Sequence, residues 1–159
     1  MTATDTATSG TVPGAVRSSA GLDPRGPQLA AGITAVILVA VLLLPQPAAT
    51  VLLAVQAVLF AIGAVRGVQA TPHAWLFRTF VRPRLAPPAE LEAPEPPRFA
   101  QGVGLAFAAV GLVGFLTGAT LVGQVAVGAA LVAALLNAVF AFCLGCEVYL
   151  LVRRFIATV

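Results

Sequence analysis

Hydrophobic residues gather into four long stretches, at residues 29–44, 48–65, 99–116 and 121–151, and the last is interrupted only by Glu147. An α-helix rises about 1.5 Å per residue, so a membrane span needs roughly 17 to 25 residues. The first three stretches are just long enough, and the fourth exceeds a bilayer. The pattern predicts an all-α protein with four membrane-spanning helices, in which the surplus end of the fourth emerges into water or tilts.

Short turns at residues 45–47 and 117–120 leave room only for a direct reversal of the chain, so the helices form two hairpins. We expect a membrane domain over residues 29–156, with spans at about 29–44, 48–65, 99–116 and 121–150 and a connector at 66–98. Residues 1–28 are rich in Thr, Ala, Ser, Gly and Pro, a composition typical of a disordered tail. The first apolar stretch starts too late for a cleaved signal peptide, so the first helix is predicted to be an uncleaved anchor.

Composition excludes an ordinary soluble domain, because 59% of the residues are apolar and only 9% are charged. All nine basic residues are arginines, and each lies before the first span, in the connector or after the fourth span. The two short turns carry no charge. By the positive-inside rule, both termini and the connector are predicted to face the cytoplasm. Scattered arginines without a dense basic patch do not indicate nucleic-acid binding.

The connector carries a helix signal, since Thr71 precedes Pro72 and Pro83 ends the segment. A helix over residues 72–82 places apolar side chains on one face and arginines on the other, which predicts an amphipathic helix at the inner face of the membrane. Residues 85–97 mix Pro with Glu and predict an extended linker. The hairpins also begin alike, at residues 27–33 and 97–103, so they resemble a parallel internal duplication.

The strongest chemical signal is the pair Cys143 and Cys146, the only cysteines of the chain. Residues three apart on a helix are neighbours, and their expected Cα separation of roughly 5 to 6 Å falls in the range of a disulfide. Arg153 and Arg154 favour a thiolate at this site, whereas the adjacent Glu147 opposes it. The spacing is that of a redox motif, which makes the pair a candidate catalytic site. The alternative is that both cysteines only pack between helices.

Two further residues are weaker candidates. His73, the single histidine, would suit acid–base work beside a thiol, and Glu147 follows the second cysteine directly. Because position 147 is Glu, the motif is not a haem attachment site. A closed zinc site would need a dimer or a carboxylate in addition to Cys143 and Cys146. No phosphate-binding loop or other cofactor motif is found, so no cofactor is expected.

Several segments together resemble the bacterial membrane family catalogued as domain of unknown function 4395, over about residues 22–156. They are residues 23–25, 76–84, 96–101 and the ending Cys-x-Gly-Cys-x-x-Tyr, filled here by Cys143, Gly145, Cys146 and Tyr149. The resemblance implies a four-span protein of the bacterial inner membrane with no established activity. It also implies a soluble thioredoxin-like or rhodanese-like partner, which fits thiol or sulfane-sulfur chemistry.

Three functions follow from these observations. The first is a cytoplasm-facing dithiol site for thiol–disulfide exchange or sulfane-sulfur handling with a soluble partner. The second is a membrane scaffold or interaction protein whose cysteines pack and whose arginine-bearing connector recruits a partner or anionic lipid. The third is a small permease for a sulfur compound, which the absence of a charged residue at membrane depth disfavours. A homo-oligomer is compatible with all three.

Overall fold

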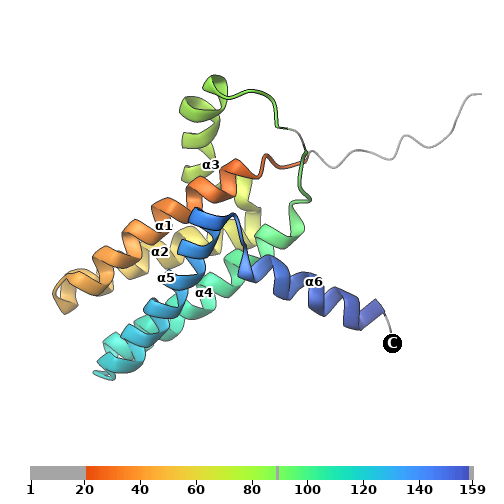
Figure 1. Ribbon diagram of the computed structural model, residues 1–159. Coiled ribbons are helices and arrows are strands. Elements are labelled where there is room, and N and C mark those ends of the chain that lie inside the picture. Colours follow the sequence, from red (N-terminus) through yellow and green to blue (C-terminus); the bar gives the residue numbers. More distant parts are fainter. Residues whose placement is uncertain (1–20, 89, 158–159) are drawn as a thin grey trace, which may run out of the picture.

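The computed structural model describes residues 21–88 and 90–157, and these residues form helices without a β-sheet (Figure 1). Four long helices are apolar enough to cross a membrane: α1 (Arg25–Leu43), α2 (Gln46–Arg66), α4 (Glu95–Leu116) and α5 (Thr120–Phe140). The predicted all-α, four-span architecture is therefore confirmed, and the chain is a membrane protein.

The four long helices pack in a ring, in which α1 contacts α2 and α5, and α4 contacts α2 and α5. Most outward-facing positions carry exposed Val and Leu, as expected for a surface that lipid covers. The buried core is small and lies along the inner faces; it consists of Leu38, Val41, Ala49, Leu53, Phe60, Ala108, Phe115, Val127 and Ala130.

The fourth apolar stretch does not form one helix over residues 121–150, so that predicted boundary is corrected. Helix α5 ends at Phe140, and a separate helix α6 (Leu144–Ala157) follows. Ala141 takes a left-handed conformation with φ of 53°, and its N–H donates to the carbonyl of Asn137 at 3.0 Å. Backbone groups of α5 are satisfied by this cap, which turns the chain away from the bundle axis.

The N-terminal boundary also differs from the prediction. Residues 1–20 of the predicted tail lie outside the described residues, but residues 25–28 already belong to α1. Leu22 and Glu92 exchange two backbone hydrogen bonds of 2.8 and 2.9 Å, which tie the start of the described chain to the end of the connector. Asp23 accepts a hydrogen bond of 3.1 Å from the N–H of Arg25 at the first turn of α1.

The connector is helical where the sequence predicts it, in the consecutive segments η1 (Val68–Ala70), α3 (Pro72–Leu76), η2 (Phe77–Val81) and η3 (Arg82–Arg84). Thr71 caps α3, because its hydroxyl oxygen accepts the N–H of Ala74 at 3.3 Å. Of the predicted apolar face, only Phe77 is buried, while Leu76 and Phe80 stay exposed beside Trp75. The connector therefore packs against the bundle mainly through the ring of Phe77, and it leaves Leu76, Phe80 and Trp75 exposed.

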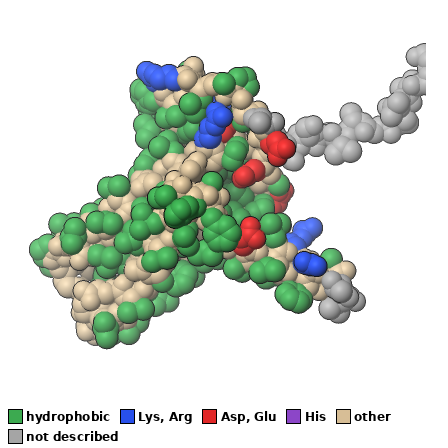
Figure 2. Space-filling model, viewed as in Figure 1, with side chains coloured by type: hydrophobic (Ala, Val, Ile, Leu, Met, Phe, Trp, Pro, Cys, Tyr) green, Lys and Arg blue, Asp and Glu red, His purple; other side chains and the backbone are tan. Residues whose placement is uncertain are grey.

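Each hairpin is followed by a helical segment that packs back against the hairpin's own first helix: α3 contacts α1, and α6 contacts α4. Both segments project from the same end of the bundle (Figure 1). This arrangement agrees with the predicted parallel duplication. The described arginines also gather at this end, which we call the arginine end (Figure 2); they are Arg25, Arg66, Arg78, Arg82, Arg84, Arg98, Arg153 and Arg154.

Candidate functional site

The cysteine pair lies where α5 gives way to α6, at the arginine end. Cys143 and Cys146 are joined by a disulfide, with their Cα atoms 5.2 Å apart. Both side chains are half-buried rather than enclosed. The Cα separation expected for residues three apart on a helix is confirmed, and it lies within the range that a disulfide requires.

Cys143 occupies the N-cap position of α6. Its carbonyl accepts the N–H of Glu147 at 3.0 Å, and its Sγ lies 3.3 Å from the N–H of Cys146, which donates to it. A side-chain acceptor at this position normally satisfies one of the free N–H groups of the first helical turn. Positive electrostatic potential at a helix N-terminus also favours negative charge on such an acceptor. The sulfur of Cys143 therefore lies at the positive end of α6.

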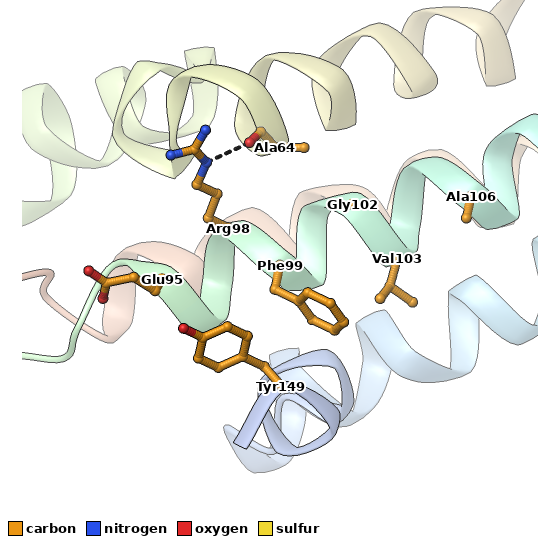
Figure 3. Close-up of a pocket in the computed structure, with 8 residues that line it drawn as sticks. All are labelled: Ala64, Glu95, Arg98, Phe99, Gly102, Val103, Ala106 and Tyr149. Carbon is orange, nitrogen blue, oxygen red and sulfur yellow. Dashed lines mark hydrogen bonds between the residues drawn. The ribbon is translucent and has the colours of Figure 1, made fainter. Parts of the chain in front are cut away.

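Helix α6 is fixed to α4 by two residues of the cysteine motif. Gly145 packs directly on Ala100, and a Cβ atom at Gly145 would lie only 2.6 Å from the Cβ atom and 2.7 Å from the Cα atom of Ala100. Tyr149 faces Phe99 with ring centroids 5.6 Å apart (Figure 3). The guanidinium of Arg153 lies 6.0 Å from the Tyr149 ring centroid. Gly145 and Tyr149 of the motif thus hold the start of α6 against α4.

A shallow groove of about 580 Å³ lies beside this contact, between α2, α4 and α6, and includes Glu95 and Tyr149 (Figure 3). Arg98 crosses from α4 to α2, where its guanidinium donates to the carbonyls of Ala64 at 2.6 Å and Val65 at 2.7 Å. These carbonyls belong to the last turn of α2, which a cation stabilises. Arg98 therefore joins the two hairpins at the arginine end.

A larger cavity of about 1130 Å³ is lined by both cysteines. Its walls come from the start of α1, the connector, the first half of α4, the second half of α5 and the start of α6. Charged residues surround the part nearest the arginine end, and they are Asp23, Arg25, Arg78, Arg82, Glu92 and Glu147. The disulfide is thus part of the wall of this cavity.

The other candidate residues separate in the structure. Glu147 lines the cavity with the cysteines, whereas His73 is not among the residues that line it. Burial lowers the pKa of His73 below its ordinary value of 6.5. Within residues 21–88 and 90–157, no group of three His, Cys, Asp or Glu side chains is arranged to hold a metal ion.

Sequence reasoning did not identify the residues that place the pair. The left-handed Ala141 has no glycine or proline to signal it, and Ala100 is one alanine among many. Gly145 and Tyr149 were visible as part of the motif, but not as contacts of α4. The single available signal was the fixed spacing of these two residues around the cysteines.

Comparison with known proteins gives one match. The model of a family described as a domain of unknown function (DUF4395) matches residues 22–154. No curated protein and no solved structure matches the chain.

Proposed function

Because this chain belongs to the DUF4395 family, whose description assigns no activity, we propose from the site itself that it is a membrane thiol–disulfide exchange protein. Cys143 and Cys146 form its reactive pair. The position of the Cys143 sulfur at the N-terminus of α6, beside a cavity, is the observation that carries this proposal.

The placement of the two sulfurs assigns different roles to them. Cys143 accepts a backbone N–H and caps the helix, so its thiolate is the stabilised one and acts as the nucleophile. Cys146 is the third residue of α6 and does not cap it, and it acts as the resolving cysteine. If the cysteines served only to pack helices together, the Cys143 sulfur would not need to lie at the N-cap of α6, a helix that is largely exposed.

The exchange runs in two balanced steps. The Cys143 thiolate attacks a disulfide of a soluble partner, so that a mixed disulfide forms and the partner releases one thiolate. Cys146 then loses its proton and attacks Cys143, which re-forms the internal disulfide and releases the second partner thiolate. The reverse sequence oxidises the partner's dithiol. A thioredoxin-like protein suits this reaction. With a persulfide-bearing rhodanese-like protein, the Cys143 thiolate would attack the outer sulfur, so that a persulfide forms on Cys143 and the rhodanese thiolate leaves; Cys146 would then attack the Cys143 sulfur, form the internal disulfide and release hydrosulfide.

We place the protein in the bacterial inner membrane with both ends of the chain and the arginine end in the cytoplasm. Eight described arginines at one end and uncharged turns at the other support this orientation. A cytoplasmic site favours a disulfide that cycles over one that is permanent.

The assignment of Cys143 is tested by alkylation rates at varied pH. Single variants Cys146→Ser and Cys143→Ser each leave one thiol. We expect the thiol of Cys143 to reach half of its maximal alkylation rate at a lower pH than the thiol of Cys146, because only the thiolate reacts. Equal profiles for the two thiols would contradict the assigned roles.

Thiol trapping tests the function and the side of the membrane together. A membrane-impermeant maleimide should label the native pair in inverted vesicles only, and only after reduction. Pairs that label without reduction in native membranes would argue against a cycling disulfide. Lack of labelling in both vesicle types after reduction, with labelling only after denaturation, would show that the cysteines are packing residues and overturn the proposal.

A scaffold function is the second candidate, because the outer part of α6 carries an uncovered apolar stripe. Its members, spaced as on one helical face, are exposed: Val148, Leu151, Val152 and Phe155. If the scaffold function holds, the protein still binds its partner when both cysteines are replaced by Ser, whereas Phe155→Ser abolishes this binding. The exchange function predicts loss of activity in the double Ser variant at unchanged abundance in the membrane.

A further inference from the structure

The larger cavity beside the cysteines reaches deep into the helical bundle. Thr34 lies about 14 Å along α1 from Arg25, and Phe107 lies about 18 Å along α4 from Glu95, at about 1.5 Å per residue. Both line the cavity, as the cysteines do. Because the hydrocarbon core of a bilayer is about 30 Å thick, the cavity extends from the arginine end to near the middle of the membrane. A molecule at its deep end therefore lies at the depth of the hydrocarbon core.

The space exists because the facing helices carry small side chains there. Ala31 of α1, Gly104 of α4 and Ala133 and Ala134 of α5 all line it. At the deep end the wall becomes aromatic, with Phe60 and Phe107. A flat ring is the shape that aromatic side chains and small residues accommodate together.

Polar groups also face this cavity, from near the arginine end, where Asn137 lies about 4.5 Å along α5 from Phe140 and Gln101 about 9 Å along α4 from Glu95, to the depth of Thr34. Thr34 is 7% exposed, and Gln101 and Asn137 are half-buried, and all three line the cavity. Hydroxyl and amide groups donate hydrogen bonds, and leaving such donors unpaired in an apolar layer is costly. They fit a ligand that presents carbonyl oxygens to them.

We propose that this cavity binds a lipid-soluble quinone, which exchanges electrons with the cysteine pair. The inference rests on the proposed thiol function and names the small-molecule reactant of the same site. The dithiol of Cys143 and Cys146 gives two electrons and two protons to the two carbonyl oxygens of the quinone. The sulfur–sulfur bond forms, both S–H bonds break, and the quinone becomes a quinol. The soluble partner then reduces the disulfide again from the water side.

A ubiquinone analogue with a short tail and a fully substituted ring is the probe, because its ring cannot add thiols covalently. The full-length protein is first reduced, and the reductant is removed in the absence of oxygen. The protein is then mixed with the probe, and the thiols that remain are trapped with a maleimide. We expect Ala133→Leu, which fills the cavity, to slow oxidation of the pair at least tenfold. Ala54→Leu adds the same side chain on an exposed position of α2 and should match the wild type.

A binding measurement separates the cavity from the chemistry. The Cys143→Ser/Cys146→Ser protein should bind a photoreactive form of the probe, and Ala133→Leu in that background should reduce the crosslinking at least tenfold. Ala133→Leu and Ala54→Leu are first checked for the melting temperature and the size-exclusion elution volume of the wild type. If Ala133→Leu misfolds, Ala134→Leu replaces it.

The outcomes distinguish the two proposals. Thiol oxidation or crosslinking that is equally efficient in the cavity-filling and control variants would overturn the quinone site, as would a cavity occupied only by phospholipid chains. Thiol exchange with a soluble partner would survive that result. A pair that cannot be reduced in the folded protein would instead overturn the proposed function, and quinone binding to the double Ser variant would then show a site without redox coupling.

Discussion

Residues without chemistry of their own determine the environment of the reactive pair. Cys143 caps α6 because its sulfur accepts the N–H of Cys146, while Gly145 lets α6 approach α4 and the ring of Tyr149 contacts that of Phe99. At this scale, the pattern Cys-x-Gly-Cys-x-x-Tyr combines two sulfurs with two contacts. Changing the contacts should move the pair without removing a thiol.

The variant Gly145→Ala tests the contact with α4. Its Cβ atom would meet the Cα atom of Ala100 at 2.7 Å, so α6 must move away from α4. We expect a loss of about 1 to 3 kcal/mol in the free energy of unfolding, measured by denaturant or thermal unfolding in detergent.

Gly128→Ala is the matched control for Gly145→Ala, because no atom lies within 4 Å of the added Cβ atom. Alanine favours helix formation by about 1 kcal/mol over glycine, so this control should be neutral or stabilising. If both variants behave alike, the close approach at Gly145 is not what holds α6.

His73 should make the connector sensitive to acid. Burial lowers the pKa of His73 below 6.5, so the unfolded segment binds a proton at a pH where the folded segment does not. Stability of the connector is therefore complete above about pH 6.5 and falls as the pH drops below that value. The fluorescence of Trp75, the single tryptophan, reports the change. His73→Gln should remove the response between pH 7.5 and 5, and an unchanged response would assign it to another group.

Elements at the arginine end owe their directions to local backbone geometry. Hydrophobicity alone would continue α5 through residue 151, but the left-handed Ala141 ends it at Phe140. Helix α6 can then leave the bundle, with its motif residues against α4 and its apolar stripe uncovered. The cysteine pair lies at this corner because of the break.

Replacing Ala141 with Gly should stabilise the protein. A left-handed conformation costs an L-residue roughly 1 to 2 kcal/mol, and glycine adopts it without a Cβ penalty. We expect a higher melting temperature for Ala141→Gly and a lower one for Ala54→Gly, which lies in the regular helix α2. A lower melting temperature for Ala141→Gly would show that the break is not strained at this residue.

At the scale of the whole molecule, the part of the chain that the structure describes has one charged end and one uncharged end. Each hairpin contributes two long helices and a segment that folds back at the arginine end, and Arg98 joins the hairpins through the carbonyls of Ala64 and Val65. The opposite end consists of two short uncharged turns. This asymmetry determines the expected orientation in the membrane.

Single cysteines in the Cys143→Ser/Cys146→Ser background test that orientation. Thr79→Cys lies on the connector and Thr117→Cys lies at an uncharged turn, and both positions are exposed. An impermeant maleimide should label Thr79→Cys in inverted vesicles and Thr117→Cys in right-side-out vesicles. The opposite pattern would reverse the orientation and place the pair outside the cytoplasm.

The sequence by itself determined the four spans, the connector helix and the spacing that brings the two cysteines together. Long apolar stretches can be satisfied in lipid only as helices, and two cysteines at this spacing meet in any helical turn. Only the tertiary structure decided where the fourth stretch breaks, which sulfur caps α6 and that a cavity runs from the pair to membrane depth. These features depend on one left-handed alanine and on small side chains of separate helices facing one another. Neither leaves a periodic pattern, because the first is the backbone conformation of a single residue and the second arises from contacts between residues far apart in the chain.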